Sequence, residues 1–420
     1  MVLSNISVPL LGMVDTGVVG HLESDIYLGA VAVGATIFGF LYWTFNFLRM
    51  GTTGIAAQLC GADDNAGLRT ALGQAMVVAV VVSALLLALQ APLGNLSIYL
   101  IGPNPDVAGH AREYFSIRIW SAPATLVNYA LIGWFLGLQN ARVPLVLVLV
   151  INMTNIVLDL VFVLGLGMKV DGVALASVIA EYCGVAVGLM FAWSELRRRV
   201  AAWSVDRLTR FGEYTRFFEV NAALFIRTLA LVFAFTFFTS QGARQSDLIL
   251  AANAVLMTLH HLLSFGLDGL AHAAEALVGK AYGAKDSIAL RRAVSLTLRW
   301  SLIIAAGYSV MFLMAGAALV SLLTDLENVR STAFEYLPWL IVSPMISVWS
   351  YLYDGVFIGV TKSRAMRDIM LGSTALIFLP AWYFLQPLGN HGLWLAFILF
   401  MVSRGVGMHY YYRRRIAAEL

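Results

Sequence analysis

Several carboxyl and amide side chains lie inside otherwise apolar segments, and such groups are suited to binding a proton or a small cation. Asp15 stands between Leu10-Leu11 and Val18-Val19. A charged residue at mid-membrane costs about 2.5–3.5 kcal/mol on insertion scales, so Asp15 needs a reason to be there. Apolar surroundings favour the neutral acid, which suits this carboxyl to taking up and releasing a proton. The alternative is a residue near the outer interface that is solvated through a short helix.

Two further polar residues, Asn155 and Asp159, stand four positions apart and therefore share one face of a helix. Ser177, in the next apolar segment, would complete an oxygen-rich cluster suited to a proton or a hard monovalent cation. The same groups also suit ordinary hydrogen bonding between helices, so both interpretations stay open. We call Asp15, Asn155, Asp159 and Ser177 the N-half polar residues.

The second half of the chain has its own intramembrane charges in Arg227, Asp268 and Asp354. Unpaired charges there would be very costly, so we expect these three residues to form a buried ion pair. Such a network suits either a transport role or a charge-neutral structural brace. Asn253 and Glu275 are expected to face the interior of the helix bundle as well, and Asn253 is a further candidate for the charge network or for substrate binding.

Long apolar helices must position these residues. Apolar residues make up 60% of the 420 residues and charged residues only 12%, and the mean hydropathy is +0.81. At roughly 20 residues per crossing, the chain is predicted to be an all-α polytopic membrane protein with twelve transmembrane helices. The predicted spans cover residues 4–20, 26–58, 70–91, 112–138, 144–166, 172–194, 217–240, 247–279, 290–323, 331–360, 366–386 and 391–412.

Turn chemistry predicts several of the breaks between spans. These breaks are expected at Gly94-Asn95, Gly102-Pro103-Asn104-Pro105, Gly165-x-Gly167 and Pro387-x-Gly389-Asn390. The polar segment 195–216 is rich in arginine and is predicted to be a basic cytoplasmic linker. It would join an N-lobe of residues 1–194 to a C-lobe of residues 217–420.

The chain repeats itself at a constant offset of 222 residues, without a gap from residue 25 to residue 142. For example, Gly61-Ala62-x-Asp64 returns as Gly283-Ala284-x-Asp286, and Tyr129-x-x-x-Gly133 returns as Tyr351-x-x-x-Gly355. Two similar halves of hydrophobic helices are typical of secondary transporters, whose halves rock about a site between them.

Basic residues concentrate in the loops on one side of the predicted membrane. They include Arg69, Arg142, the linker arginines and the tail Arg413-Arg414-Arg415, whereas the opposite loops are sparse or acidic. The positive-inside rule therefore places both termini in the cytoplasm. Six spans per half is an even number, so the two repeats are predicted to be parallel.

The sequence lacks the motifs of the enzyme classes that would use a membrane cleft. Gly279-Lys280 lacks the earlier glycine of a P-loop, and neither His-Glu-x-x-His nor Gly-x-Ser-x-Gly occurs. Cys60 and Cys183 are isolated, and His260-His261 lacks metal-ligand spacing. We therefore expect no enzymatic activity, no cofactor and no metal site, with Na⁺ binding at the N-half polar residues as the alternative.

A series of motifs in order along the chain carries a family resemblance. They are Val8-Pro9-Leu10-Leu11-Gly12-Met13-Val14-Asp15-Thr16, Arg49-Met50-Gly51-Thr52-Thr53-Gly54, Asn155-Ile156-Val157-Leu158-Asp159, Ala174-Leu175-Ala176-Ser177-Val178-Ile179-Ala180-Glu181, Ala252-Asn253-Ala254-Val255-Leu256-Met257-Thr258, Ala281-Tyr282-Gly283-Ala284-Lys285-Asp286 and Asp354-Gly355-x-Phe357-Ile358-Gly359. With them the chain resembles the MATE (multidrug and toxic compound extrusion) family, specifically its DinF-like branch, over essentially all 420 residues. The resemblance implies two pseudo-symmetric six-helix lobes, a V-shaped cleft, and export of organic cations against inward H⁺ or Na⁺.

The resemblance also implies roles for individual residues. Asp15 matches the first-helix aspartate that the family uses for cation coupling, and the other N-half polar residues match the remaining polar members of that site. Some relatives carry Thr in place of Ser177. Asp354 resembles the tenth-helix aspartate of the NorM-like branch. That branch places a glutamate on its seventh helix where this chain has Arg227, and this departure favours the N-lobe as the coupling site.

We therefore expect a multidrug antiporter that exports organic, mainly cationic, compounds in exchange for H⁺. Protonation of Asp15 from outside would rearrange the polar network around Asp159 and expel substrate. A dry Na⁺ site needs roughly five or six oxygen ligands whereas a proton needs one carboxyl, so H⁺ is the favoured coupling ion. Na⁺ coupling and a lipid-linked precursor flippase are the alternatives. The expected partners are small organic cations, drugs and the lipid bilayer, with no nucleic acid and no obligate protein partner.

Overall fold

The computed structural model describes residues 25–199, 201 and 208–419, and these residues form helices and turns without any β-strand. The predicted first span, 4–20, and Asp15 lie outside the described residues. The described chain divides into two compact units between Phe217 and Phe218. We call them the N-unit and the C-unit.

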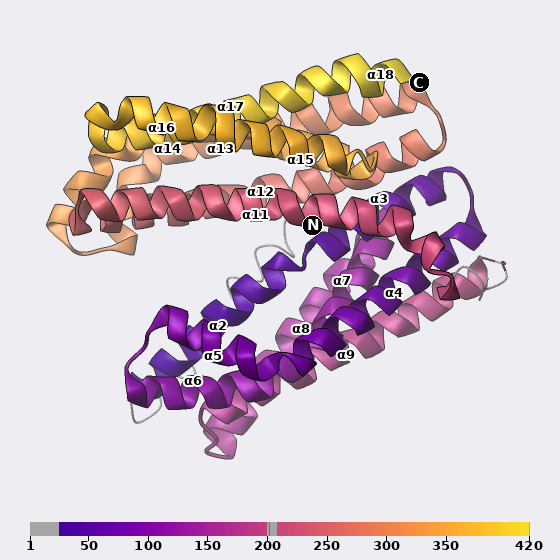
Figure 1. Ribbon diagram of the computed structural model, residues 1–420, viewed down its shortest axis with the longest axis horizontal. Helices are drawn as coiled ribbons and strands as arrows, with labels where there is room; N and C mark the ends of the chain where they lie inside the picture. The colour runs from indigo at the N-terminus through magenta and orange to yellow at the C-terminus, as the bar shows by residue number, and fades with distance from the viewer. Residues whose placement is uncertain (1–24, 200, 202–207, 420) are drawn as a thin grey trace. The chain divides into compact units, whose positions relative to one another are not determined.

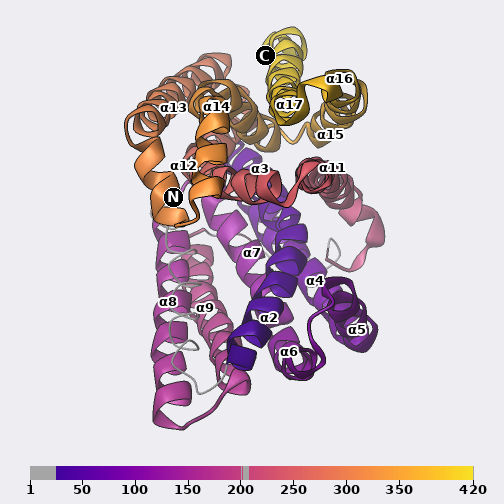
Figure 2. The same cartoon turned by 90° about the vertical axis from the view of Figure 1, so that its left-hand side faces the viewer.

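The N-unit is built from helices α2 to α9, coloured indigo to magenta in Figure 1. They are α2 (Asp25–Thr44), α3 (Phe47–Gly61), α4 (Asn65–Ala88), α5 (Gln90–Ile101), α6 (Pro105–Arg118), α7 (Ala122–Gly137), α8 (Arg142–Asp159) and α9 (Val170–Arg198), with a 3₁₀ turn at Ile119–Ser121 and a π-helical turn at Leu160–Gly165. Helices α8 and α9 run side by side, as do α3 and α7 (Figures 1 and 2).

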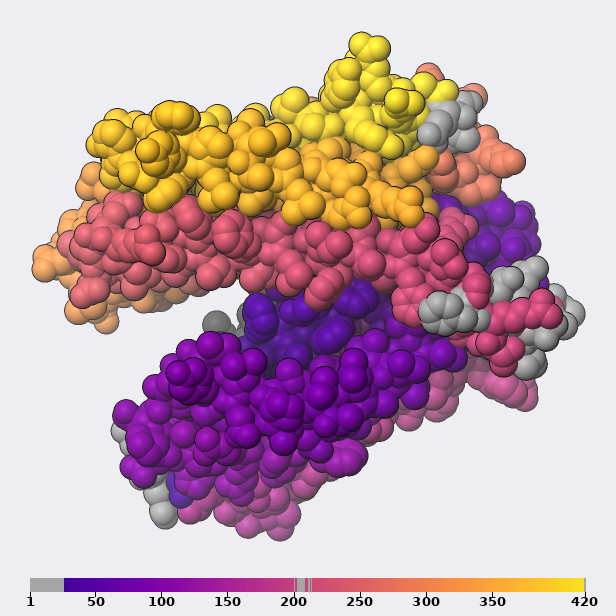
Figure 3. Space-filling view, viewed as in Figure 1, coloured from indigo at the N-terminus to yellow at the C-terminus, as the bar shows by residue number. Residues whose placement is uncertain are grey.

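A 3₁₀ turn at Phe211–Tyr214 precedes the C-unit helices. These are α11 (Thr215–Gln245), α12 (Asp247–Gly283), α13 (Ser287–Leu323), α14 (Glu327–Gly359), α15 (Ser363–Gly372), α16 (Leu379–Leu385), α17 (Gly389–Tyr411) and α18 (Ala417–Glu419), with π-helical turns at Ser373–Phe378 and Tyr412–Ile416 and a 3₁₀ turn at Gln386–Leu388. Aromatic side chains fix α11 against α16 and α17, which lie alongside it in Figure 3. The rings of Phe237 and Trp382 are 5.0 Å apart, and those of Phe238 and Trp394 are 5.1 Å apart.

Ten segments of the described chain are long and apolar enough to cross a membrane. The last of them, Ser363–Ile416, contains two of the predicted spans. Gly389 separates these two spans with a φ of +57°, in the left-handed region that glycine adopts without steric cost. The turn predicted at this position is therefore present.

One predicted break is wrong. Gly94 and Asn95 lie inside helix α5, which continues to Ile101. Gly94 packs closely against an aromatic ring, because a Cβ built on it would lie 2.8 Å from Phe115 Cδ1. The glycine thus permits close packing between helices, and the helix break lies earlier, between Ala88 and Gln90. The turn predicted at Gly102 is present, with a φ of +64°.

The 222-residue repeat extends to the detailed geometry of the turns. Asp64 accepts a hydrogen bond from the Gly67 amide at 2.7 Å, and Asp286 accepts one from the Ala289 amide at 2.8 Å. Each aspartate caps the helix that follows it. Four non-glycine residues of the described chain have positive φ, and they form two pairs at the repeat offset: Asp63 with Lys285, and Gln139 with Thr361.

Equivalent glycines also bring equivalent helices together in both units. A Cβ on Gly133 would lie 2.4 Å from the Arg49 carbonyl oxygen, so α7 can approach α3 only with glycine there. A Cβ on Gly355 would lie 2.3 Å from the Ala271 carbonyl oxygen, which is the same contact between α14 and α12. Small residues permit such close approach in membrane helix bundles.

Candidate functional site: buried charges in both units

Helices α8 and α9 bring two of the N-half polar residues into contact. The Asn155 Nδ2 atom donates a hydrogen bond to Ser177 Oγ at 3.1 Å, and both side chains are buried. Asp159 lies one helical turn after Asn155 on α8 and is 0% exposed. Three of the four predicted residues therefore belong to one helix pair, and the fourth, Asp15, lies outside the described residues.

The buried face of α8 explains why these polar groups point inward. Its buried residues recur at helical spacing and include Leu147, Asn152, Asn155 and Asp159. Asp159 is the last α-helical residue before the π-helical turn, in which the Leu166 amide donates to the Val161 carbonyl oxygen at 2.9 Å. Such turns are frequent at functional sites because they shift the register of the side chains that follow.

The N-unit also contains a carboxylate that the sequence analysis did not assign. Asn128 Nδ2 donates to Glu181 Oε2 at 2.8 Å and to the Glu181 carbonyl oxygen at 3.0 Å. Gly184 leaves room for this amide, since a Cβ there would lie 3.1 Å from Asn128 Nδ2. The Arg118 guanidinium interacts electrostatically with Glu181. This second polar cluster joins α6, α7 and α9.

In the C-unit, two arginines bind one aspartate. Arg227 Nη2 on α11 and Arg404 Nη2 on α17 both donate to Asp354 Oδ2 on α14, the second at 2.9 Å. The three residues are 6%, 3% and 7% exposed, respectively. The charge-assisted hydrogen bonds from the two guanidinium groups join three helices. The structure thus brings together Arg227 and Asp354, as expected for a buried ion pair.

Asp268 belongs to the same electrostatic network. It is half-buried on α12 and interacts electrostatically with Arg404 and with Tyr351. The Tyr351 hydroxyl is hydrogen-bonded to Ser264 Oγ. The C-unit network therefore contains two arginines and two aspartates, so it is neutral when all four are ionised.

Asn253 lies in a different cluster from these charges. It exchanges two hydrogen bonds with Asn390, at 2.8 and 2.9 Å, and accepts one from Trp394 Nε1 at 2.9 Å. Asn253 precedes Asp268 on α12 by about 22 Å of helix length, at 1.5 Å per residue. Its amide joins α12 to α17 and does not contribute to the charge network. Glu275, also on α12, is buried as expected.

Four buried or half-buried charges were missed by the sequence analysis. They are Arg49, Arg118, Glu181 and Arg404, which fall within the predicted spans 26–58, 112–138, 172–194 and 391–412. The signal that could have found them is the one that found Arg227, namely an ionisable residue inside an apolar span.

Comparison with known proteins agrees with this twofold organisation. The MatE family model matches residues 1–161 and 223–384, once in each half of the chain. The chain belongs to the MatE family. It is 42% identical over 419 residues to DNA damage-inducible protein F of Escherichia coli (strain K12), covering 99% of this chain and 90% of that relative. This match confirms the predicted DinF-like resemblance.

A second relative is the probable multidrug resistance protein NorM of Rhizobium meliloti (strain 1021). It is 26% identical over 431 residues, covering 96% of this chain and 90% of the relative. A solved structure, described as the outward-facing conformation of a multidrug resistance MATE family transporter of the MOP superfamily, matches with a TM-score of 0.85. That match covers 99% of this chain and 93% of the other at 19% identity.

These matches confirm the predicted all-α, twelve-span polytopic fold. They also identify this MatE protein as a multi-pass membrane transporter of the multidrug efflux family rather than an enzyme.

Proposed function

We propose that this MatE transporter exports organic, mainly cationic, compounds in exchange for protons that carboxyl groups of the N-unit take up. The observation that carries the proposal is the fully buried Asp159 carboxyl, one turn from the Asn155–Ser177 hydrogen bond. Amide and hydroxyl groups can each donate or accept hydrogen bonds, so a carboxyl in their company can be neutral or ionised. Asp354, by contrast, accepts charge-assisted hydrogen bonds from two guanidinium groups.

In the proposed cycle, Asp15 takes up a proton from the outer side and the polar network around Asp159 rearranges. The substrate is then expelled from the N-unit. We further propose that the protein lies in the bacterial inner membrane with both termini cytoplasmic. The linker arginines and the tail Arg413-Arg414-Arg415 lie on one side of the predicted membrane, and basic loops of membrane proteins face the cytoplasm. Residues 1–194 and 217–420 would be the two lobes, joined by the basic linker 195–216.

Sodium coupling is the second candidate. Asn155, Asp159 and Ser177 supply oxygen atoms from adjacent helices, and oxygen is the ligand that hard cations prefer. A Na⁺ site would need several of these oxygens at once, whereas proton binding needs one carboxyl.

The test is efflux of a fluorescent organic cation from proteoliposomes, with a pH gradient and a Na⁺ gradient imposed separately. Proton coupling predicts efflux under the pH gradient alone, in Na⁺-free buffer. Efflux under the Na⁺ gradient alone would reverse the assignment. Empty liposomes and liposomes that hold Asp247→Asn, a change at an exposed residue of α12, serve as controls.

A further inference from the structure

The second polar cluster of the N-unit forms where one membrane span is kinked. Helix α6 ends at Arg118, a 3₁₀ turn follows at Ile119–Ser121, and α7 continues with Pro123 in its first turn. Proline and 3₁₀ geometry are the usual causes of a kink within a helix. The arginine at the kink lies about midway along the apolar segment Pro105–Gly137, where a charge needs compensation.

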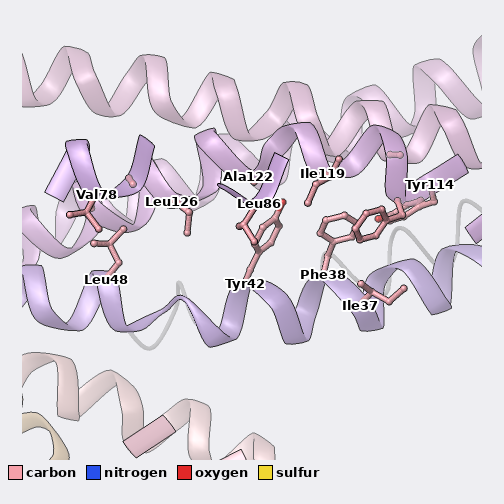
Figure 4. Packing of buried hydrophobic residues seen from close by; sticks show 14 of the residues in the cluster. Ile37, Phe38, Tyr42, Leu48, Val78, Leu86, Tyr114, Ile119, Ala122 and Leu126 are labelled. Carbon is pink, nitrogen blue, oxygen red and sulfur yellow. The ribbon is translucent and has the colours of Figure 1, made fainter. Parts of the chain in front are cut away.

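Two aromatic rings of α2 provide part of that compensation. The Arg118 guanidinium carbon lies 5.9 Å from the ring centroid of Phe38 and 5.9 Å from that of Tyr42. Both rings are buried, and they project from α2 toward the segment that carries Ile119 and Ala122 (Figure 4). A cation at this distance from an aromatic face is attracted by the ring quadrupole. The Tyr42 hydroxyl is hydrogen-bonded to Ser121 Oγ at 2.7 Å, which fixes its ring.

Glu181 provides the opposite charge, since it interacts electrostatically with Arg118. Asn128 Nδ2 holds the Glu181 carboxylate at 2.8 Å. The Oδ1 atom of the same amide is buried and has no hydrogen-bond partner among the described residues. A buried acceptor of this kind normally accepts a hydrogen bond, and leaving it without a donor costs free energy. Beside the carboxylate, the cluster therefore has a vacant acceptor.

Aromatic faces, a carboxylate and a vacant amide oxygen are the groups that recognise a planar organic cation with N–H donors. We propose that the Arg118 guanidinium is an internal competitor at a cation-binding site, and that substrates with a guanidinium or amidinium head displace it from Phe38, Tyr42 and Glu181. The inference rests on the proposed function and deepens it by naming the residues and the chemical class of the substrate head group.

A purely structural role makes opposite predictions. If Arg118 and Glu181 only brace the kink, removing the arginine disturbs the site and weakens every ligand. If Arg118 competes with the ligand, removing its charge strengthens the binding of cations alone. A neutral ligand of the same shape distinguishes two causes of tighter binding. It should gain affinity if the variant only creates space, and should not gain if the effect depends on the charge of the ligand.

The experiment measures the binding of phenylguanidinium and of neutral phenylurea to the purified full chain by titration calorimetry. Arg118→Gln should tighten phenylguanidinium binding about tenfold, or about 1.4 kcal/mol, because the ligand no longer has to displace the arginine from the aromatic faces and the carboxylate. Glu181→Gln should weaken it about tenfold. In the Glu181→Gln background, Arg118→Gln should bring a smaller gain, because the ligand then gains only the aromatic faces of Phe38 and Tyr42.

Matched controls come from positions outside the cluster on the same helices, the exposed Arg112 and the half-buried Glu195. Arg112→Gln on α6 and Glu195→Gln on α9 should leave both affinities unchanged. Arg118→Lys keeps the positive charge and should bind phenylguanidinium more weakly than Arg118→Gln does. If Arg118→Gln does not fold, Arg118→Met replaces it, and the Glu181→Gln measurement remains independent of both.

Four outcomes would overturn the inference. They are an equal gain for phenylurea, weaker phenylguanidinium binding by folded Arg118→Gln, unchanged affinity in Glu181→Gln, and no phenylguanidinium binding by the wild type. Export of tetraphenylphosphonium under a pH gradient is measured in parallel. If that export persists while the binding predictions fail, the proposed function stands and only this inference falls.

Discussion

The N-unit and the C-unit have matching turns and close helix contacts but different buried charges. Asp64 and Asp286 cap equivalent helices, and Gly133 and Gly355 make the same contact with a facing carbonyl oxygen. These positions determine where the helices lie, and the sequence repeat is preserved at them. The positions that differ between the units are those that decide the chemistry of the interior.

Asp354 illustrates the difference. Its equivalent at the repeat offset in the N-unit is Ile132, so only the C-unit has a carboxylate at that position. Two arginines, Arg227 and Arg404, bind it there. In the N-unit, Asp159 lies one turn from the Asn155–Ser177 hydrogen bond. Glu181 accepts a hydrogen bond from the Asn128 amide and interacts electrostatically with one arginine, Arg118.

This comparison suggests a division of labour. A carboxylate bound by two guanidinium groups is held by charge-assisted hydrogen bonds and contributes to structure. Carboxyl groups beside amides and hydroxyls are able to change state, which coupling requires. The predictions below test this division, beginning with the largest effect.

The first prediction is that Asp15→Asn abolishes coupled efflux while expression and folding stay near normal. The asparagine mimics only the protonated carboxyl, so the cycle of proton uptake and release stops. Efflux from proteoliposomes under a pH gradient measures the effect, and Asp247→Asn in the C-unit is the matched control. If Asp15→Asn supported efflux at the wild-type rate, Asp15 would not be the residue that couples efflux to protons.

The second prediction concerns the C-unit charges. Arg227→Gln or Arg404→Gln should each destabilise the protein by about 3–5 kcal/mol, because each leaves a buried charge poorly compensated. Combining either arginine change with Asp354→Asn should restore part of the lost stability. Combining it with Asp268→Asn should restore less. Thermal unfolding in detergent measures each variant. Strict additivity in every double variant would show that these residues do not interact.

Much of the fold could be predicted from the sequence because apolar length and turn chemistry act locally. The 222-residue offset indicated the equivalence of Asp64 with Asp286 before any contact was known. Gly94 was misread because a glycine that ends a helix and one that packs against Phe115 look alike in sequence. Only the neighbouring helix distinguishes them.

The candidate site was less predictable, because pairing between distant residues is not encoded locally. The pairing of Asn155 with Ser177 follows from their helical positions once α8 and α9 are known to be adjacent. Arg404 lies 50 residues after its partner Asp354, and no local pattern connects them. The Asn253 amide shares α12 with Asp268, but its hydrogen-bond partners come from α17.

The third prediction compares the two units by proton release. In weakly buffered, Na⁺-free solution, binding of a cationic substrate should acidify the medium, and Asp15→Asn should remove most of this signal. Asp159→Asn should reduce the signal severalfold, whereas Asp354→Asn should leave it unchanged when paired with Arg227→Gln to keep charges balanced. Loss of release only in the Asp354 variant would move the titrating group to the C-unit.

The last prediction has the smallest effect and concerns the preserved part of the repeat. Asp64→Ala and Asp286→Ala should each cost about 1 kcal/mol of stability, because each removes an N-cap hydrogen bond of nearly equal length. The serine variants Asp64→Ser and Asp286→Ser keep a capping oxygen and should lose less. Thermal unfolding measures all four, and efflux under a pH gradient should persist in each. If the loss of stability occurred in only one unit, the two turns would have the same geometry but contribute differently to stability. The similarity between the units would then be limited to the backbone.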